Sequence, residues 1–418
     1  MIYPVRLKSL FTFLTLLILT GTSYSLASSE GSTSESAHVF EGRTDHKKVV
    51  FTFDGGGARG YIQAVAAGEL ERRVRTLTDI DDLRLAECLD FVAGTSTGSI
   101  TSSYLTCPDS DDPSRPRYSA SSLVDYFDAH IHEVFQRSFL KRLKSLFGLS
   151  GPKFSSYGFE GLLNDLFGDT PLKQAVVPTA ITTLELSDKD RGTRPLILTS
   201  FDANPADMPN SYADNFSEVS FKDACRSSGA APTYFKPHRV PDNDGEIHHC
   251  VDGGVMGANN PVEVGFDYAS ILSRNKEEHL HDSDFSIVSF GTGKAPLYIS
   301  GESAEGFGLA QWGLKMLPIL LDAPSMLMEE KMAAQFPVDN PELEGCYFRF
   351  QPVLEEPIDL ADTSPAALET LRKVAHDYIE ANEDKFDHVA CILAARYTAK
   401  QSEGTASSIH SEDDDDDL

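Results

Sequence analysis

The sequence predicts an α/β protein, because short apolar runs typical of strands alternate with stretches that are compatible with helices. The run Val49–Phe53 is apolar, β-branched and aromatic, and a helix-compatible stretch at residues 61–76 follows it. The same order recurs at Leu89–Ala93 and Ser99–Leu105. With 418 residues, 41% of them hydrophobic, the chain can bury a large core, either as one domain or as a core with insertions.

The two ends of the chain are expected to lie outside this fold. Residues 1–27 combine a basic start, an apolar run and a small-residue cleavage site, which is typical of a signal peptide and predicts a secreted or periplasmic protein. An uncleaved membrane anchor is the alternative, although the apolar run is short for a membrane span. Residues 28–45, rich in Ser, Thr, Glu and Gly, are expected to form a flexible linker, and residues 401–418 an acidic disordered tail.

The chain is strongly acidic, with 36 Lys and Arg residues against 64 Asp and Glu and a formal charge of -28. Removal of residues 1–27 discards two basic residues, Arg6 and Lys8, and changes the charge to -30 (34 minus 64). This balance argues against nucleic acid as a partner and against electrostatic attraction to anionic lipid surfaces. Any transient contact with a membrane surface must therefore be hydrophobic, local or mediated by a partner.

Gly94, Ser96 and Gly98 form a Gly-x-Ser-x-Gly pattern between the second predicted strand and the helix that follows it. A serine hydroxyl is a weak nucleophile, so an enzyme that uses it must leave its approach uncrowded and supply a proton acceptor. A sharp strand-to-helix turn with small neighbours meets the first need, and the helix N-terminus adds positive potential. The pattern also fits a turn that is merely tightly packed, so its interpretation depends on partner residues.

Three consecutive glycines, Gly55, Gly56 and Gly57, follow the first predicted strand. Consecutive glycines allow a sharp turn and leave backbone N–H groups uncovered, which suits the binding of an oxyanion. Gly55, Gly57 and Gly60 also match a dinucleotide-binding fingerprint, with acidic residues downstream at the spacing of a ribose contact. This fingerprint is weak alone, and it does not account for the serine turn farther along the chain.

Asp252 precedes Gly253 and Gly254 in a segment rich in residues that favour turns. An aspartate before two glycines is often only a turn former. Beside a glycine loop and a serine turn, it becomes a candidate for the carboxylate that accepts the serine proton. The three motifs in this order indicate the hydrolysis of acyl esters.

These motifs resemble the pattern of the patatin-like phospholipase family, which has a glycine-rich loop ending in Arg-Gly, a Gly-x-Ser-x-Gly turn and a later Asp-Gly-Gly. The resemblance covers roughly residues 47–396. It implies a catalytic domain at residues 46–400, with a three-layer α/β/α fold and a mainly parallel central sheet. It also implies an enzyme of the phospholipase A type that acts on phospholipids or other acyl lipids and needs no cofactor.

The resemblance implies a role for each matching residue. Ser96 is then the nucleophile, Asp252 takes its proton directly, and the backbone amides of the Gly55–Gly57 loop hold the oxyanion. Supporting positions are Gly94, Gly98, Gly253, Gly254 and Arg59. Arg59 either braces the loop or offers positive charge to a phosphate head group.

Two alternatives to this function stay open. An enzyme with a Ser-Asp-His triad would need a histidine after Asp252, and His376 and His388 follow it in the chain. Both lie in a charged, helical stretch at residues 366–397, where a histidine is more often solvated or structurally paired. The second alternative is a lipid-binding protein that keeps the fold without turnover, and the intact Ser96 argues against it.

No metal site is expected from the sequence. His248, His249 and Cys250 carry ligand atoms, but adjacent residues on a strand point to opposite faces, and the closed spacing of a zinc site is absent. The six cysteines are scattered along the chain. Their pairing stays undecided, with buried free thiols expected for several of them.

Two segments are candidates for contact with a membrane surface. Residues 139–149 combine apolar and basic residues at helical spacing, and residues 306–332 are rich in Leu and Met and contain Trp312. Packing against the core is the alternative for both segments. The motifs specify neither the lipid head group nor any need for a protein activator.

Overall fold

The computed structural model describes residues 47–135, 151–187, 192–202, 215–276, 278, 280–296 and 298–412. The expected signal peptide at residues 1–27, the linker at 28–45 and the membrane segment at 139–149 lie outside the described residues. Among the described helices, none combines the length and the apolar character that crossing a membrane would require.

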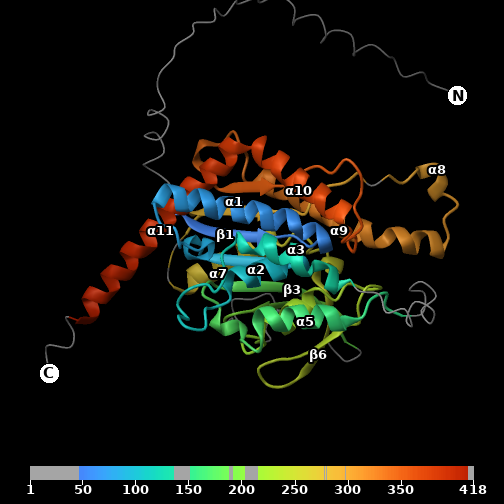
Figure 1. Cartoon of the computed structure of the whole chain (residues 1–418), viewed down its shortest axis with the longest axis horizontal. Helices are drawn as coiled ribbons and strands as arrows, with labels where there is room; N and C mark the ends of the chain where they lie inside the picture. Colours follow the sequence, from blue (N-terminus) through green and yellow to red (C-terminus); the bar gives the residue numbers. More distant parts are fainter. Residues whose placement is uncertain are drawn as a thin grey trace, which may run out of the picture. The chain divides into compact units, whose positions relative to one another are not determined.

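A central sheet has the strand order β5-β6-β3-β2-β1-β7-β8, with β4 also paired to β3 (Figure 1). The strands are β1 Lys48–Phe53, β2 Phe91–Thr95, β3 Thr179–Leu186, β4 Arg194–Thr199, β5 His238–Pro241, β6 Ile247–Asp252, β7 Phe285–Phe290 and β8 Tyr347–Phe350. Strands β3, β2, β1, β7 and β8 run parallel, whereas β4, β5 and β6 pair antiparallel to their neighbours. The prediction of a mainly parallel sheet is confirmed.

Helices cover both faces of this sheet (Figure 1). The described helices are α1 Tyr61–Thr78, α2 Thr97–Thr106, α3 Ser122–Val134, α5 Ser156–Phe167, α6 Phe221–Ser228, α7 Val262–Asn275, α8 Gly301–Ala304, α9 Leu309–Gln335, α10 Pro365–Glu380 and α11 Glu383–Glu412. Successive side chains of a strand point to opposite faces. Phe51 and Phe53 of β1 therefore join the core beneath α1, α10 and α11, while Val50 joins a second core with α7 and α9. The predicted three-layer α/β/α arrangement is confirmed.

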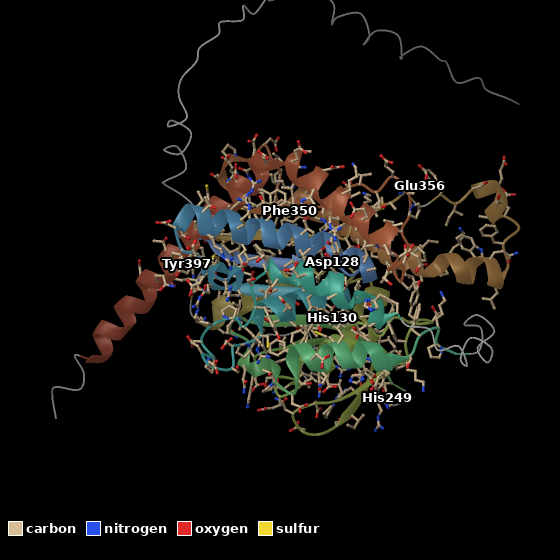
Figure 2. The ribbon with its side chains drawn as sticks, viewed as in Figure 1. Asp128, His130, His249, Phe350, Glu356 and Tyr397 are labelled. Carbon is tan, nitrogen blue, oxygen red and sulfur yellow. The ribbon has the colours of Figure 1, made fainter. Side chains whose placement is uncertain are left out.

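A stack of four aromatic rings fixes α11 on the sheet. Phe53 of β1 stacks on Phe290 of β7 with 4.9 Å between ring centroids, and Phe290 stacks on Phe350 of β8 at 5.3 Å. Phe350, labelled in Figure 2, then contacts Phe386 of α11 at 4.5 Å. Each such pair adds about 0.5–1.5 kcal/mol beyond the burial of its area. The stack therefore crosses the neighbouring strands β1, β7 and β8 in turn and ends on α11.

Some predicted elements end at different residues in the structure. Strand β2 begins at Phe91 rather than at Leu89, because the carboxylate of Asp90 turns back to accept a hydrogen bond from the N–H of Val49 at 2.8 Å. The helical stretch predicted at residues 366–397 is divided between α10 and α11. At the break, Asn382 Nδ2 donates to the carbonyl of Tyr378 at 2.7 Å and so satisfies a group at the end of α10.

The boundary predicted at residue 400 lies inside α11, which continues to Glu412. The first part of the expected disordered tail is therefore helical, and residues 413–418 lie outside the described residues. Arg396 pairs with Glu403 across this boundary at 2.8 Å. The ion pair between Glu403 and Arg396, two turns earlier, favours continuation of the helix. The prediction of a disordered tail is based on acidic composition, which does not reveal this pair.

Arg396 also gives a prediction about stability. This side chain is 3% exposed and donates to the carboxylate of Asp90 at 2.7 and 2.8 Å, which joins α11 to the start of β2. Arg396→Met should lower the free energy of unfolding by about 3 kcal/mol, because Asp90 loses its partner in a mostly buried position. Urea titration measures the effect. As a control, Lys373→Met breaks only an exposed pair with Asp377 and should cost less than about 1 kcal/mol. Equal losses would contradict the role given to Arg396.

Candidate active site

Ser96 and Asp252 come together because β2 and β6 meet end to end along one edge of β3. Thr95, the last residue of β2, pairs with Thr182, and Asp252, the last residue of β6, pairs with the next residue, Thr183. The side-chain oxygens of Thr95 and Thr182 form a hydrogen bond of 2.6 Å at this junction. Ser96 follows Thr95, so two residues far apart in the sequence occupy neighbouring positions.

Ser96 occupies a strained turn between β2 and α2. Its backbone has φ 53° and ψ -120°, a region that few residues other than glycine adopt, at a cost of about 1–3 kcal/mol. Hydrogen bonds hold the turn. The N–H of Ser96 donates to Ser228 Oγ at 2.8 Å, and its carbonyl accepts from the N–H and the hydroxyl of Ser99 at 3.0 and 2.6 Å. The predicted strand-to-helix turn is present, with α2 starting at the next residue.

The glycines on either side of Ser96 allow this turn to pack closely. Gly94 lies in β2 and Gly98 in the first turn of α2. A Cβ atom on Gly98 would lie 2.1 Å from the carbonyl oxygen of Phe53, so no other residue fits between α2 and the end of β1. This contact holds the serine turn against the strand that leads into the glycine loop.

Asp252 is a buried carboxylate with two donors. Its Oδ1 accepts the backbone N–H of Gly254 at 2.8 Å, within the short 3-10 helix Gly253–Met256 that follows β6. Burial raises the pKa of Asp252 to about 6, partly offset by hydrogen bonds from the Ser96 hydroxyl and from the N–H of Gly254. The carboxylate is therefore ionised at neutral pH, and it is a stronger base than an exposed aspartate.

The three glycines of the loop differ in their hydrogen bonding. The N–H of Gly55 donates to the carbonyl of Asn259 at 2.9 Å, whereas the N–H groups of Gly56 and Gly57 bond to no described residue. Gly57 has φ 59°, and a Cβ atom there would lie 2.2 Å from the carbonyl oxygen of Leu360. Two of the three expected amides are thus available to a ligand, while the amide of Gly55 fixes the loop.

A cavity of about 620 Å³, counted with its opening to solvent, contains Ser96, Asp252, Gly56 and Gly57. Its other walls are mostly aliphatic and aromatic, and include Ile100, Ile131, Val134, Phe135, Phe159, Tyr234, Phe235, Leu321 and Leu360. A mainly apolar cavity with a few polar groups at one place favours a ligand that is apolar except at one reactive group.

Arg59 follows the glycine loop in the 3-10 helix Gly57–Gly60 and is not among the residues that line the cavity. Its side chain is buried, and among the described residues its Nε has no hydrogen-bond partner. Burial lowers the pKa of Arg59, partly offset by the charges of Asp322, Asp359 and Asp54. The side chain therefore supplies buried positive charge near the loop, among three carboxylates, and both roles expected for it stay predictions.

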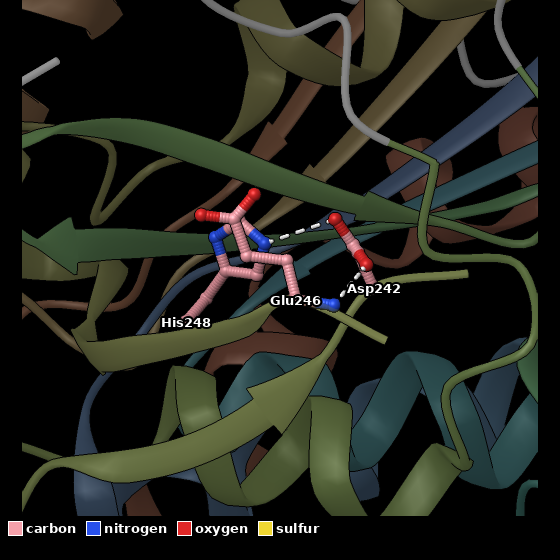
Figure 3. A group of neighbouring side chains, drawn as sticks. All are labelled: Asp242, Glu246 and His248. Carbon is pink, nitrogen blue, oxygen red and sulfur yellow. Dashed lines mark hydrogen bonds and ion pairs between the residues drawn. The ribbon is translucent and has the colours of Figure 1, made fainter. Parts of the chain in front are cut away.

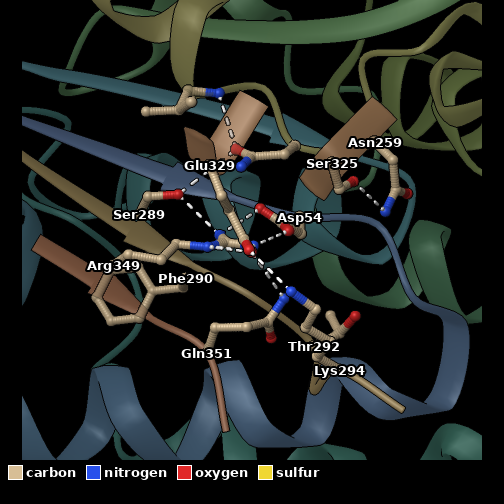
Figure 4. Close-up of polar contacts among 12 residues, drawn as sticks. Asp54, Asn259, Ser289, Phe290, Thr292, Lys294, Ser325, Glu329, Arg349 and Gln351 are labelled. Atoms are coloured by element: carbon tan, nitrogen blue, oxygen red, sulfur yellow. Dashed lines mark hydrogen bonds and ion pairs between the residues drawn. The ribbon is translucent and has the colours of Figure 1, made fainter. Parts of the chain in front are cut away.

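Asp54, just before the glycine loop, forms an ion pair that the sequence motifs do not indicate (Figure 4). Both of its carboxylate oxygens accept hydrogen bonds from Arg349 of β8, at 2.9 and 2.6 Å. Arg349 also donates to Ser289 of β7 at 2.8 Å and to Glu329 of α9 at 2.9 Å. Residues that follow β1, lie in β7 and lie in α9 all bond to the guanidinium of Arg349. The base of the loop is therefore held to the edge of the sheet and to α9.

Two further residues position the loop and were not singled out as site residues. The hydroxyl of Thr292 donates to the carbonyl of Gly55 at 3.0 Å. Asn259 Nδ2 lies 3.4 Å from the same carbonyl and 3.3 Å from Ser325 Oγ of α9. Neither residue belongs to one of the three motifs, and only the folded chain brings their side chains to the loop.

His376 and His388, the histidines of the triad alternative, lie away from Ser96. His376 is exposed on α10, and the ring of His388 packs against Phe348 at 5.2 Å between centroids. Neither residue is among those that line the cavity. The described geometry therefore gives Ser96 a carboxylate neighbour and no imidazole.

The histidine pair of β6 alternates between faces as expected. His249 is exposed, whereas His248 is buried with Nδ1 2.9 Å from Glu185 and Nε2 3.2 Å from Asp242. Figure 3 shows His248 with Asp242 and Glu246, whose ligand atoms all lie within 4.8 Å of one another. Both nitrogens of His248 already contact carboxylates, and these contacts hold the β5–β6 hairpin, which ends in Asp252, onto β3.

All six cysteines are free thiols. Five are buried and Cys391 on α11 is exposed. Cys225 of α6 lies 3.1 Å from Ser103 Oγ of α2, in the layer directly behind the serine turn. The expectation of buried free thiols is confirmed, and the cysteines act here as small apolar residues in the core.

A family model described as patatin-like phospholipase matches residues 51–266, more than half of the chain. The matched region includes the glycine loop, the serine turn and Asp252. The chain therefore belongs to the patatin-like phospholipase family, and the resemblance indicated by the motifs is confirmed.

Individual proteins are similar over most of the chain. Patatin-like protein 4 of Arabidopsis thaliana is 26% identical over 351 residues, which cover 80% of this chain and 83% of that protein. Patatin-like protein 1 of the same plant is 32% identical over 280 residues, 63% of each chain. Human GIVD cytosolic phospholipase A2 overlaps with a TM-score of 0.37 at 10% identity, over 85% of this chain and 61% of that chain. The backbone overlap is low, so the family assignment rests on the sequence match.

The glycine loop gives a prediction about activity. Gly57→Ala should lower kcat/KM for a soluble ester by about 100-fold or more, because the new Cβ would strike the carbonyl of Leu360 and displace the free amides of the loop. The matched control is Gly161→Ala, which makes the same change in α5, where the added atom meets open space. The control should keep full activity. Comparable activity of the two variants would show that the position of the loop does not matter.

Proposed function

We propose that this chain is a lipid acyl hydrolase that cleaves fatty-acyl esters of phospholipids or related polar lipids through an acyl-Ser96 intermediate. Membership of the patatin-like phospholipase family supports the general activity. The observation that carries the assignment is the convergence of Ser96, Asp252 and the unbonded amides of Gly56 and Gly57 in one largely apolar cavity. Such a cavity suits an acyl chain, whose only polar group is the ester to be cleaved.

In the first half of the reaction, Ser96 Oγ attacks the carbonyl carbon of the ester and its proton passes to the carboxylate of Asp252. The carbonyl oxygen becomes an oxyanion, which accepts hydrogen bonds from the N–H groups of Gly56 and Gly57. When this intermediate collapses, the ester C–O bond breaks and the proton on Asp252 passes to the leaving alcohol. The products of this half are acyl-Ser96 and a lysolipid or other alcohol.

Water completes the second half by the same route. Asp252 accepts a proton from a water molecule as its oxygen attacks the acyl carbon, and the amides of Gly56 and Gly57 again hold the oxyanion. Collapse returns the proton to Ser96 Oγ and releases the fatty acid. The sum is one ester and one water converted to one acid and one alcohol, with no histidine required.

The electrostatics of the cavity favour this division of roles. A carboxylate is a weak base toward a serine hydroxyl, so most of the barrier reduction must come from the oxyanion site, where one lost donor typically costs about 2.7–4 kcal/mol. We assign Arg59 the support of the glycine loop, because its buried guanidinium lies among the charges of Asp322, Asp359 and Asp54 and is not among the residues that line the cavity. Replacement of Arg59 by Met should then lower activity toward charged lipids and neutral esters alike.

Fatty-acid release from mixed phospholipid vesicles by the full chain tests the proposal. Ser96→Ala should reduce release by about 1,000-fold or more, since the nucleophile is lost, and Asp252→Asn by about 100- to 10,000-fold. A chelator should leave the rate unchanged, because no step uses a metal. Full activity of either variant would overturn the assigned roles. Loss of activity with the chelator would replace the mechanism by a metal-dependent one.

The raised pKa of Asp252 gives a prediction about pH. Below a pH of about 6 the carboxyl is protonated and cannot accept the serine proton, so kcat/KM for a soluble ester should rise through pH 6 and level off above it. The control is circular dichroism across the same range, which separates titration from unfolding. A profile with its midpoint near the ordinary aspartate value of about 3.9 would contradict the effect of burial.

A further inference from the structure

Helix α9 carries a continuous apolar stripe on its solvent side. The stripe consists of Leu309, Trp312, Met316, Leu320, Ala323 and Leu327, all of them exposed, with Leu309 at 92% and Leu327 at 73% of their full exposure. With 3.6 residues per turn, these positions fall within an arc of about 80° and extend over about 27 Å. Exposed large apolar side chains are normally scattered, so a stripe of this length indicates a surface that is covered in use.

The first half of α9 also carries almost no charge. Residues 306–321 contain a single charged residue, Lys315, in a chain of which 24% is charged. An amphipathic surface helix would place polar residues on its outer side, whereas this helix is apolar on both sides. A helix that is apolar all round is usually buried, and here its outer side faces solvent. The surface that covers it is therefore itself apolar or without net charge.

The opposite side of the same helix contributes to the proposed active site. Leu321 lines the cavity with Ser96 and Asp252, Ser325 contacts Asn259, and Glu329 binds the Arg349 that holds Asp54. These three residues occupy successive turns, so the turns before them extend past the site. Figure 1 shows these first turns of α9, with α8 beside them, apart from α1, α3 and α10.

We propose that the α9 stripe docks on the surface of a phospholipid membrane without net charge and holds the cavity at that surface. This inference deepens the proposed function and rests on it, since an acyl-lipid substrate is what such docking would deliver. The cavity then lies one helix diameter, about 10 Å, from the lipid surface. Interfacial helices bury their apolar side to a depth of about 5–10 Å, so a lipid has little distance to cross.

Two observations favour a lipid surface of this kind over a protein partner. Trp312 lies on the stripe with its ring 5.6 Å from Phe307, and tryptophan is the side chain that prefers the boundary between acyl chains and head groups. The net charge of -28 repels an anionic membrane, whereas a zwitterionic surface can be reached through apolar contact alone. The stripe therefore fits phosphatidylcholine better than phosphatidylglycerol.

Trp312 is the only tryptophan of the chain, so its fluorescence reports on the stripe directly. The experiment uses the full chain with Ser96→Ala, which prevents turnover, and titrates it with phosphatidylcholine vesicles. The emission of Trp312 should move to shorter wavelength, and lipids brominated on their acyl chains should quench it. Inclusion of phosphatidylglycerol should not strengthen binding.

The test variant is Leu309→Glu with Met316→Glu, which leaves Trp312 in place. Partitioning into vesicles should weaken about tenfold for each residue, since burial of one large apolar side chain is worth about that factor. The matched control is Leu77→Glu with Val338→Glu, which makes the same change in charge at exposed apolar residues outside α9. With Ser96 intact, both pairs should hydrolyse a soluble ester at the normal rate, and only the α9 pair should lose hydrolysis of vesicles.

Failure of this inference is distinguishable from failure of the proposed function. If Trp312 does not respond to vesicles, or if the two variant pairs partition equally, the docking surface is wrong even when soluble ester is hydrolysed. Binding that requires anionic lipid, or a concentration-dependent dimer in sedimentation in place of vesicle binding, would also overturn it. If Trp312 enters the bilayer but no ester is cleaved, the docking surface stands and the proposed function falls.

Discussion

The site depends above all on how one edge of β3 is shared. Strand β2 occupies the first half of that edge and β6 the second, and they run in opposite directions so that their carboxyl ends meet. A shift of one residue in either ladder would turn Ser96 or Asp252 to the other face of the sheet. The register therefore fixes the pairing of hydroxyl and carboxylate before any side-chain contact refines it.

Around this junction the protein maintains two unfavourable conditions. Ser96 has a strained backbone, and Asp252 is a carboxylate in a buried position. Both persist because their surroundings are over-determined: Ser228, at the end of α6, accepts from Ser96 and donates to the carbonyl of Thr182 at 2.7 Å. Helix α6 therefore both covers the sheet and holds the strained backbone of Ser96 in place.

Much of this could be predicted from the sequence, and the remainder has a physical reason for being missed. The alternation of apolar runs with helix-compatible stretches predicts the layered α/β fold, and the glycines around Ser96 predict the strand-to-helix turn. Local sequence determines both features. The Arg349–Asp54 pair joins residues 295 positions apart through an edge strand, and no local pattern reports such a contact. Likewise, the N–H of Gly55 cannot serve a ligand because it donates to the carbonyl of Asn259, and only folding brings this carbonyl near.

The state of the thiols determines how the chain reacts with thiol reagents. Burial raises the pKa of Cys225 and Cys250 to about 12 and that of Cys107 to about 11, so almost no thiolate forms at neutral pH and these groups resist oxidation and alkylation. The core packs around reduced sulfur and needs no cross-link for its geometry. A thiol reagent should therefore reach the exposed Cys391 first, and the buried sulfurs only when the fold opens.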